Sequence, residues 1–205
     1  MQTITSTYKG EFRDKGSKFI GLLIPASTQT LIESALESVR SEHPKATHHC
    51  YAYRIDPNSI IEFTQDDGEP SGTAGAPIMN ALRSANLINC ILISVRYYGG
   101  TKLGKSGLIN AYGECARQTI DSAKLKKVVP ISRYRIIYDY PQQSLIEQLK
   151  NEFQLVELRS EYTDIIKIEL GCPLQLHDRF EKTVKTSEHL LNKLERLENS
   201  FHIES

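Results

Sequence analysis

The chain of 205 residues is 40% hydrophobic, and its 25 basic and 25 acidic side chains give a formal net charge of zero. This length and composition predict a folded globular protein with one large or two small domains. A net charge of zero excludes an overall field that attracts nucleic acids or membranes, so any such partner must meet a local patch.

The first part of the chain alternates strand-like and helix-like segments. Residues 17–23 are expected to form a strand, and apolar residues then recur at helical spacing over residues 31–39. Residues 47–55 and 60–64 predict a hairpin, because the Asp-Pro-Asn sequence at 56–58 is typical of a turn.

Two glycine-rich blocks follow: residues 66–75, the first glycine block, and residues 96–107, the second glycine block. A helix is expected to start at Pro77, a buried strand over residues 90–95, and a third helix around Leu108. Both blocks place charged or aromatic side chains on glycine-rich backbone, which is typical of loops that approach a ligand closely. The sequence therefore predicts that function lies in these two blocks.

A domain boundary is expected at Pro130, dividing a first domain, 1–130, from a second, 131–205. The second domain is predicted to contain strand 134–140, helix 141–151, strands 154–160 and 164–170, a helix from Leu174 and a final strand 201–203. Leucines in residues 187–199 either extend that helix or start another. The βαββαβ order predicts a ferredoxin-like sandwich, and the whole chain belongs to the α+β class.

The second glycine block matches the P-loop pattern, since Gly99 and Gly104 are followed by Lys105 and Ser106 at the required spacing. A P-loop also needs a doubly wound parallel sheet and a second strand that ends in a magnesium-binding acid. The first domain leaves too little chain after this block for those elements. Nucleotide hydrolysis is therefore not the favoured function.

The same block is expected to bind anions at the start of the following helix, where free amides and the helix dipole act together. Basic side chains add charge, and tyrosines can stack on bases, although strand alternation should place one of the two tyrosines in the core. The predicted nucleic-acid or anion-binding residues are Arg96, Tyr97, Tyr98, Gly99, Gly100, Lys102, Gly104 and Lys105.

The first glycine block is expected to shape an adjoining cleft. Its carboxylates suggest two alternatives: a magnesium or manganese site shared with a histidine, or a turn capped by Asp66 or Asp67 with Ser71 and Thr73 satisfying amides of the next helix. The second is favoured, with no catalytic residue, metal or cofactor, and adjacent histidines facing opposite sides of a strand. The cleft residues are His48, His49, Asp66, Asp67, Gly68, Glu69, Ser71, Gly72 and Thr73.

Several segments together resemble the IMPACT family, in its bacterial YigZ branch. They are KGSKF at 15–19, HHCYAY at 48–53, DDGEPSGTAG at 66–75 and RYYGG at 96–100, with LG at 103–104, GL at 107–108 and AY at 111–112. The chain departs from the family pattern at His49, where asparagine is common, and at Lys105-Ser106, where small residues are usual. The second departure creates the P-loop match, which indicates that this match is accidental.

The resemblance implies a first domain like the second domain of a small-subunit ribosomal protein, and a ferredoxin-like second domain. It also implies a non-enzymatic regulator of translation that binds RNA or the ribosome, with a possible protein partner in translation control and no membrane or DNA specificity. Two alternatives remain open: a metal-dependent hydrolase or peptidase using Asp66, Asp67 and Glu69, and a pure protein-interaction module.

The four cysteines show no paired spacing and are expected to be small buried residues in a reducing compartment. Neither a signal peptide nor a run of eighteen apolar residues is present. We therefore expect a cytoplasmic location.

Overall fold

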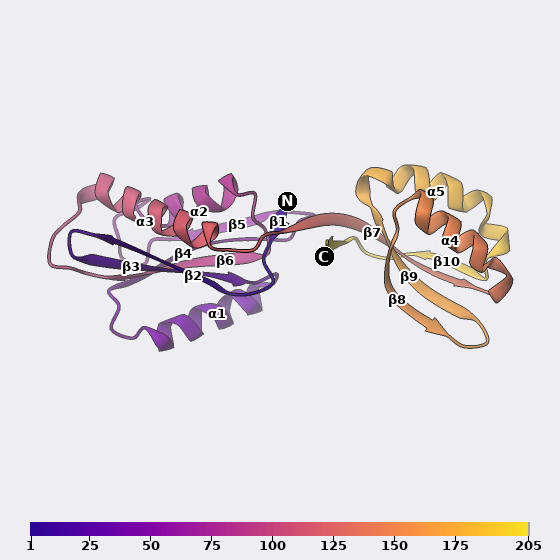
Figure 1. Ribbon diagram of the computed structural model, residues 1–205, viewed down its shortest axis with the longest axis horizontal. Coiled ribbons are helices and arrows are strands. Elements are labelled where there is room, and N and C mark those ends of the chain that lie inside the picture. Colours follow the sequence, from indigo (N-terminus) through magenta and orange to yellow (C-terminus); the bar gives the residue numbers. More distant parts are fainter. Residues whose placement is uncertain (205) are drawn as a thin grey trace. The chain divides into compact units, whose positions relative to one another are not determined.

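The computed structural model describes residues 1–204, which form two compact units, Met1–Lys127 and Val128–Glu204 (Figure 1). Each unit has helices packed on a β-sheet, and the predicted α+β class is confirmed. The expected boundary residue, Pro130, lies inside strand β7 (Lys126–Tyr138), which continues without a break. No helix within residues 1–204 is long and apolar enough to cross a membrane.

The first unit is built on a five-stranded antiparallel sheet in the order β2-β3-β6-β4-β5. Its strands are β2 (Tyr8–Asp14), β3 (Ser17–Pro25), β4 (His48–Ile55), β5 (Ile61–Gln65) and β6 (Cys90–Tyr97). Helices α2 (Gly75–Ser84) and α3 (Gly104–Asp121) cover one face, and α1 (Gln29–Glu42) covers the other (Figure 1). A short strand, β1 (Gln2–Thr3), pairs with the start of β7.

Strand β6 is the central strand of this sheet. Its residues from Cys90 to Arg96 are all buried, because helices cover both faces and consecutive side chains point to opposite cores. Leu92 packs beneath α2 and α3, whereas Ile91 and Ile93 belong to the core under α1. The unbroken apolar run predicted this buried strand, and the structure confirms it.

Strand β2 was not predicted. Its exposed residues Lys9, Glu11 and Arg13 alternate with Gly10 and Phe12, a pattern with little of the β-branched content that marks most strands. The strand lies at the edge of the sheet, where charged residues on the exposed side prevent pairing with other chains.

Helix α3 packs directly against the backbone of β2 and β3. Gly10 and Gly21 are paired across these strands, and Thr119 of α3 lies over both of them. A Cβ atom at Gly10 would lie 2.8 Å from Thr119 Cα, and one at Gly21 would overlap Thr119 Oγ1. The absence of side chains at these two positions therefore sets how closely the helix approaches the sheet.

The second unit contains an antiparallel sheet in the order β8-β9-β7, with β10 and β11 both paired to the other edge of β7. Its further elements are α4 (Gln143–Glu152), β8 (Val156–Tyr162), β9 (Ile166–Pro173), α5 (His177–Thr186), β10 (Lys193–Arg196) and β11 (Ser200–Ile203). Figure 1 shows both helices on one face of this sheet. The ferredoxin-like assignment stays a prediction, which this order supports.

Residues 187–199 differ from the prediction of a helix. Helix α5 ends at Thr186, a single 3-10 turn follows, and Leu194 lies in β10 opposite Ile136 of β7. Leu191 and Leu194 pack against the core of the second unit. Their spacing of three residues is typical of a helix, but pairing with β7 makes residues 193–196 a strand.

The close packing at Gly21 gives a test of the first unit. We expect Gly21→Ala to lower the free energy of unfolding by about 1–3 kcal/mol, because the added methyl group overlaps Thr119 Oγ1. Urea denaturation measures the loss. In the double variant with Thr119→Ala, the combined loss should be smaller than the sum of the single losses, whereas simple additivity would contradict the contact.

Candidate functional site

The first glycine block folds around the carboxylate of Asp66. Asp66 Oδ2 accepts a hydrogen bond from Gly72 N at 2.8 Å, and Oδ1 accepts from Ala74 N and Gly75 N at 2.9 Å each. Burial alone would raise the pKa of Asp66, but these three amide hydrogen bonds outweigh it and lower the pKa below its ordinary value of 3.8. The capping role expected of Asp66 or Asp67 thus falls to Asp66, which occupies the N-terminus of α2.

The side chains of Ser71 and Thr73 do not cap α2 as expected. Thr73 is buried, and its Oγ1 donates to Pro70 O at 2.6 Å instead of accepting from a helix amide. Ser71 is exposed. The distant carboxylate of Asp66 has replaced the local caps that the sequence suggested.

Asp67 joins this block to strand β4. Its Oδ2 accepts from His49 N at 2.7 Å, and its carbonyl oxygen accepts from His48 Nδ1 at 2.8 Å. The ring of His49 donates instead to His43 O at 3.2 Å, and burial lowers the pKa of His49. The two histidine rings therefore bond to different residues, His48 to Asp67 and His49 to His43.

Glu69 and Arg96 form a buried ion pair between the two glycine blocks. Arg96 Nη1 lies 2.6 Å from Glu69 Oε1, and the two side chains are only 6% and 4% exposed. Tyr112 of α3 donates its hydroxyl to the same Glu69 oxygen at 2.7 Å, and Arg96 Nη2 donates to Ser17 Oγ at 3.3 Å. His48 Nε2 lies 3.8 Å from Glu69.

The two tyrosines that follow Arg96 have different surroundings. The Arg96 guanidinium carbon lies 5.4 Å from the centre of the Phe19 ring and 5.5 Å from that of Tyr98. Tyr98 is 47% exposed, whereas Tyr97 packs against the core under α1 and its hydroxyl lies 2.9 Å from His43 Nδ1. The structure confirms that one tyrosine of the pair belongs to a core.

The carboxylates of the first glycine block thus point to different partners. Asp66 binds amides, Asp67 binds strand β4, and Glu69 binds Arg96. Within residues 1–204, no three His, Cys, Asp or Glu side chains are grouped as a metal site requires. Burial raises the pKa of the nearby Cys50 thiol to about 12, so this thiol is protonated and not a ready nucleophile at neutral pH.

The N-terminus of α3 differs from that of α2. Its N-cap residue, Leu103, offers no acceptor, and no side chain caps the first amides of the helix among residues 1–204. Lys102 and Lys105 beside it are exposed. Gly104 has a φ of +71°, and a Cβ there would meet nothing within 4 Å, so open space adjoins this backbone.

A hollow of about 370 Å³ joins the two glycine blocks at this point. Six of its lining residues belong to the predicted set: Glu69, Arg96, Tyr98, Lys102, Gly104 and Lys105. Pro70, Leu103 and Leu108 complete the lining and were not predicted, because hydrophobic residues carry no chemical signal of a site. The remaining predicted residues lie outside it: His48, His49, Asp66, Asp67, Gly68, Ser71, Gly72, Thr73, Tyr97, Gly99 and Gly100.

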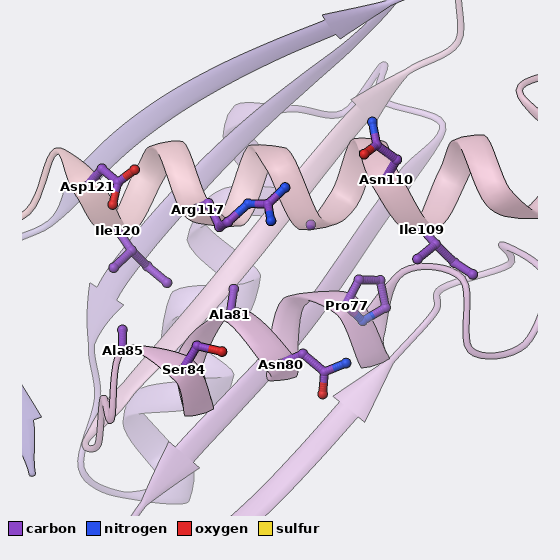
Figure 2. A pocket seen from close by; sticks show the side chains of 11 residues that line it. Pro77, Asn80, Ala81, Ser84, Ala85, Ile109, Asn110, Arg117, Ile120 and Asp121 are labelled. Atoms are coloured by element: carbon purple, nitrogen blue, oxygen red, sulfur yellow. The ribbon is translucent and has the colours of Figure 1, made fainter.

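A larger hollow, about 540 Å³, lies between α2 and α3 and was not predicted. Figure 2 shows side chains of both helices lining it, among them Pro77 and Asn80 of α2 and Ile109 of α3. Its one basic side chain, Arg117, is paired with Glu114. This hollow therefore lacks the unpaired cations that an anion site needs.

Comparison with known proteins gives a consistent result. The profile described as the Impact N-terminal domain matches residues 15–120. The Escherichia coli protein "IMPACT family member YigZ" is 33% identical over 162 residues, which cover 78% of this chain and 79% of that protein. The Bacillus subtilis protein "IMPACT family member YvyE" is 32% identical over 172 residues, covering 82% and 77%.

A solved structure resembles nearly the whole chain. It is titled "Crystal structure of an hypothetical protein", is 30% identical and has a TM-score of 0.66. The match covers 96% of this chain and 97% of that one.

The cap on α2 predicts an acid-sensitive contribution to stability. We expect Asp66→Asn to reduce the free energy of unfolding at pH 7 by about 1–2 kcal/mol, because an amide cannot accept from all three backbone N–H groups. Since the folded-state pKa of Asp66 is lowered, the carboxylate stabilises above its ordinary pKa, and the difference should vanish as pH falls through the folded value. Urea titrations at several pH values measure it.

Asp121→Asn is the matched control for this measurement, because Asp121 is an exposed aspartate of the same unit. Because its carboxylate lies at the C-terminus of α3, where the helix dipole disfavours negative charge, the substitution should leave stability at pH 7 unchanged or slightly higher. A pH-independent difference between wild type and Asp66→Asn would contradict the capping role of the ionised carboxylate.

The buried ion pair gives a second, larger effect. Glu69→Gln should cost about 3–5 kcal/mol, because the Arg96 guanidinium then stays buried without its counter-charge. Adding Arg96→Met should restore part of the stability, since it removes the unpaired charge. Denaturant unfolding measures both, and a double variant less stable than Glu69→Gln alone would contradict this account.

Proposed function

This chain belongs to the IMPACT family, and from that premise we propose that it regulates translation by binding RNA on the ribosome, without catalysing a reaction. The phosphate contact lies in the hollow between the two glycine blocks. The observation that carries the proposal is the uncapped N-terminus of α3, which adjoins this hollow together with Lys102 and Lys105.

The difference between α2 and α3 supports this choice of site. Both helices follow a glycine block, so both N-termini have free amides and a positive dipole end that attracts anions. At α2 the carboxylate of Asp66 already occupies that position. Among residues 1–204 no such carboxylate occupies the position at α3, and the charge around it is positive, which favours an external anion such as an RNA phosphate.

Tyr98 supplies the second part of the proposed contact. Its ring lines the hollow, is about half exposed and rests against the Arg96 guanidinium, which holds the ring in place for stacking on a base. Arg96 itself is engaged with Glu69 and Ser17, but its buried Nε has no hydrogen-bond partner among residues 1–204. We therefore assign Arg96 chiefly to positioning Tyr98, with Lys102 and Lys105 as the phosphate-binding cations.

The assignment to translation rests on the family. The likeness to domains of translation proteins that the family resemblance implies favours RNA of the ribosome over other anions. The hydrolase alternative gains no support, because the three carboxylates that it requires are directed at separate partners within the first unit.

The proposal predicts salt-sensitive binding to ribosomes. The double substitution Lys102→Ala with Lys105→Ala should weaken co-sedimentation at least tenfold and reduce the slope of log affinity against log salt by about 2, as expected for two lost phosphate contacts. Arg96 is left unchanged, because its substitution would break the buried ion pair. Sedimentation at low and moderate salt measures both quantities.

Lys182→Ala with Lys185→Ala is the charge-matched control, since both lysines are exposed on α5. This variant should keep the affinity and salt slope of the wild type. Failure of the wild-type protein to bind ribosomes at low salt would overturn the proposed function. Equal losses of affinity in the two double variants would show that the hollow is not the binding site.

A further inference from the structure

The two edges of the first sheet differ in chemistry. At one edge, β2 exposes Lys9, Glu11 and Arg13, charges that discourage pairing with another strand. At the other edge, β5 exposes Ile61 and Phe63, which are 50% and 44% accessible. Sheet edges are normally protected against unwanted pairing, so an apolar edge in a sheet whose opposite edge is charged indicates an interaction surface.

The exposed side chains of β5 continue an aromatic row on the α1 face of the sheet. Phe63 is paired with Tyr53 of β4, with ring centres 5.6 Å apart and planes inclined by 21°, and the Tyr51 ring centre lies 6.1 Å away. Ile61 lies opposite Ile55 in the same register. The row therefore stops at β5, with its last two members half exposed to solvent.

Within residues 1–204, no backbone hydrogen bond occupies the outer edge of β5. Strand β5 pairs with β4 alone, and none of its backbone groups bonds to a loop or helix. On the α2 side, a hollow of about 430 Å³ adjoins the strand, lined by Glu62, Phe63, Thr64 and residues of α2. The outer edge of β5 is thus open to another strand.

We propose that β5 pairs antiparallel with β5 of a second copy of this chain, across a two-fold axis at Phe63, so that the two sheets become continuous. This interface is independent of the anion site proposed above. The strand is nearly neutral: its one charged residue, Glu62, already forms ion pairs with Arg54 and Arg83. A copy of the same strand therefore meets no unpaired carboxylate.

The side-chain pattern selects this register. In an antiparallel pair, opposite residues lie on the same face, so the axis must pass through a residue rather than between two. An axis at Glu62 would place two carboxylates opposite each other, and one at Thr64 would leave Ile61 outside the paired strands. An axis at Phe63 pairs all five residues of the strand, places Glu62 opposite Thr64, and brings the two Phe63 rings together.

The short strand sets the expected strength. A five-residue edge buries less surface than a standard interface, so we expect a reversible dimer with a dissociation constant on the order of 10–100 μM. Sedimentation velocity of the full chain over a range spanning this value measures it. A wild-type protein that stays monomeric at several hundred micromolar, well above that range, would overturn the proposal.

Phe63→Lys should raise the dissociation constant at least tenfold, because the two introduced lysines would lie opposite each other and repel. Ile109→Lys is the matched control, since Ile109 is 47% exposed on α3 of the same unit. The control should dimerise like the wild type. Dimer loss in Ile109→Lys but not in Phe63→Lys would place the interface at the hollow between α2 and α3 and contradict the proposal.

Disulfide trapping tests the register without depending on the fold of a lysine variant. All four native cysteines are buried, so an introduced cysteine reports its own surroundings. Under mild oxidation Phe63→Cys should crosslink, because opposite residues lie within disulfide reach. Ile61→Cys should not, because the two copies of residue 61 would be roughly 13 Å apart, four residues along the strand. Efficient crosslinking of Ile61→Cys alone would overturn this register.

Discussion

The buried ion pair between Glu69 and Arg96 holds the candidate site together. Glu69 belongs to the first glycine block and Arg96 to the end of the central strand, and Tyr112 of α3 donates to the same carboxylate. One carboxylate thus fixes a loop, a strand and a helix. Since both charges are removed from water, each is stable only in the presence of the other, so that the two blocks keep one geometry.

This arrangement makes the two glycine blocks chemically unequal. The first is an internally satisfied loop whose Asp66 binds amides up to the start of α2, which gives it a structural role. The second leaves its helix N-terminus uncapped beside Lys102 and Lys105. Both blocks contain glycine and charged residues, so the sequence did not distinguish them. Among residues 1–204, the helix N-terminus at the second block has no capping side chain, and the proposed function therefore rests on the second block.

Much of the fold could be predicted from periodicity. The apolar run of β6, the amphipathic helix α1 and the hairpin of β4 and β5 follow from local patterns, as do β7, α4, β8, β9, α5 and β11 of the second unit. Strand β2 was missed because it has few β-branched residues, and the packing of its Gly10 against Thr119 depends on a residue far along the chain. Residues 193–196 were predicted as helix because the leucine spacing is helical, and the prediction was wrong because pairing with β7 makes them a strand.

The sequence by itself determined the family, through motifs long enough to be specific, and identified the two blocks in which site residues lie. Only the tertiary structure decided the roles of those residues. It paired Arg96 with a carboxylate 27 positions away, packed Tyr97 against a core while exposing Tyr98, and left β5 as an open apolar edge. The physical reason is that charge neutralisation, burial and strand pairing depend on which distant segments meet, and no local pattern of residues specifies that.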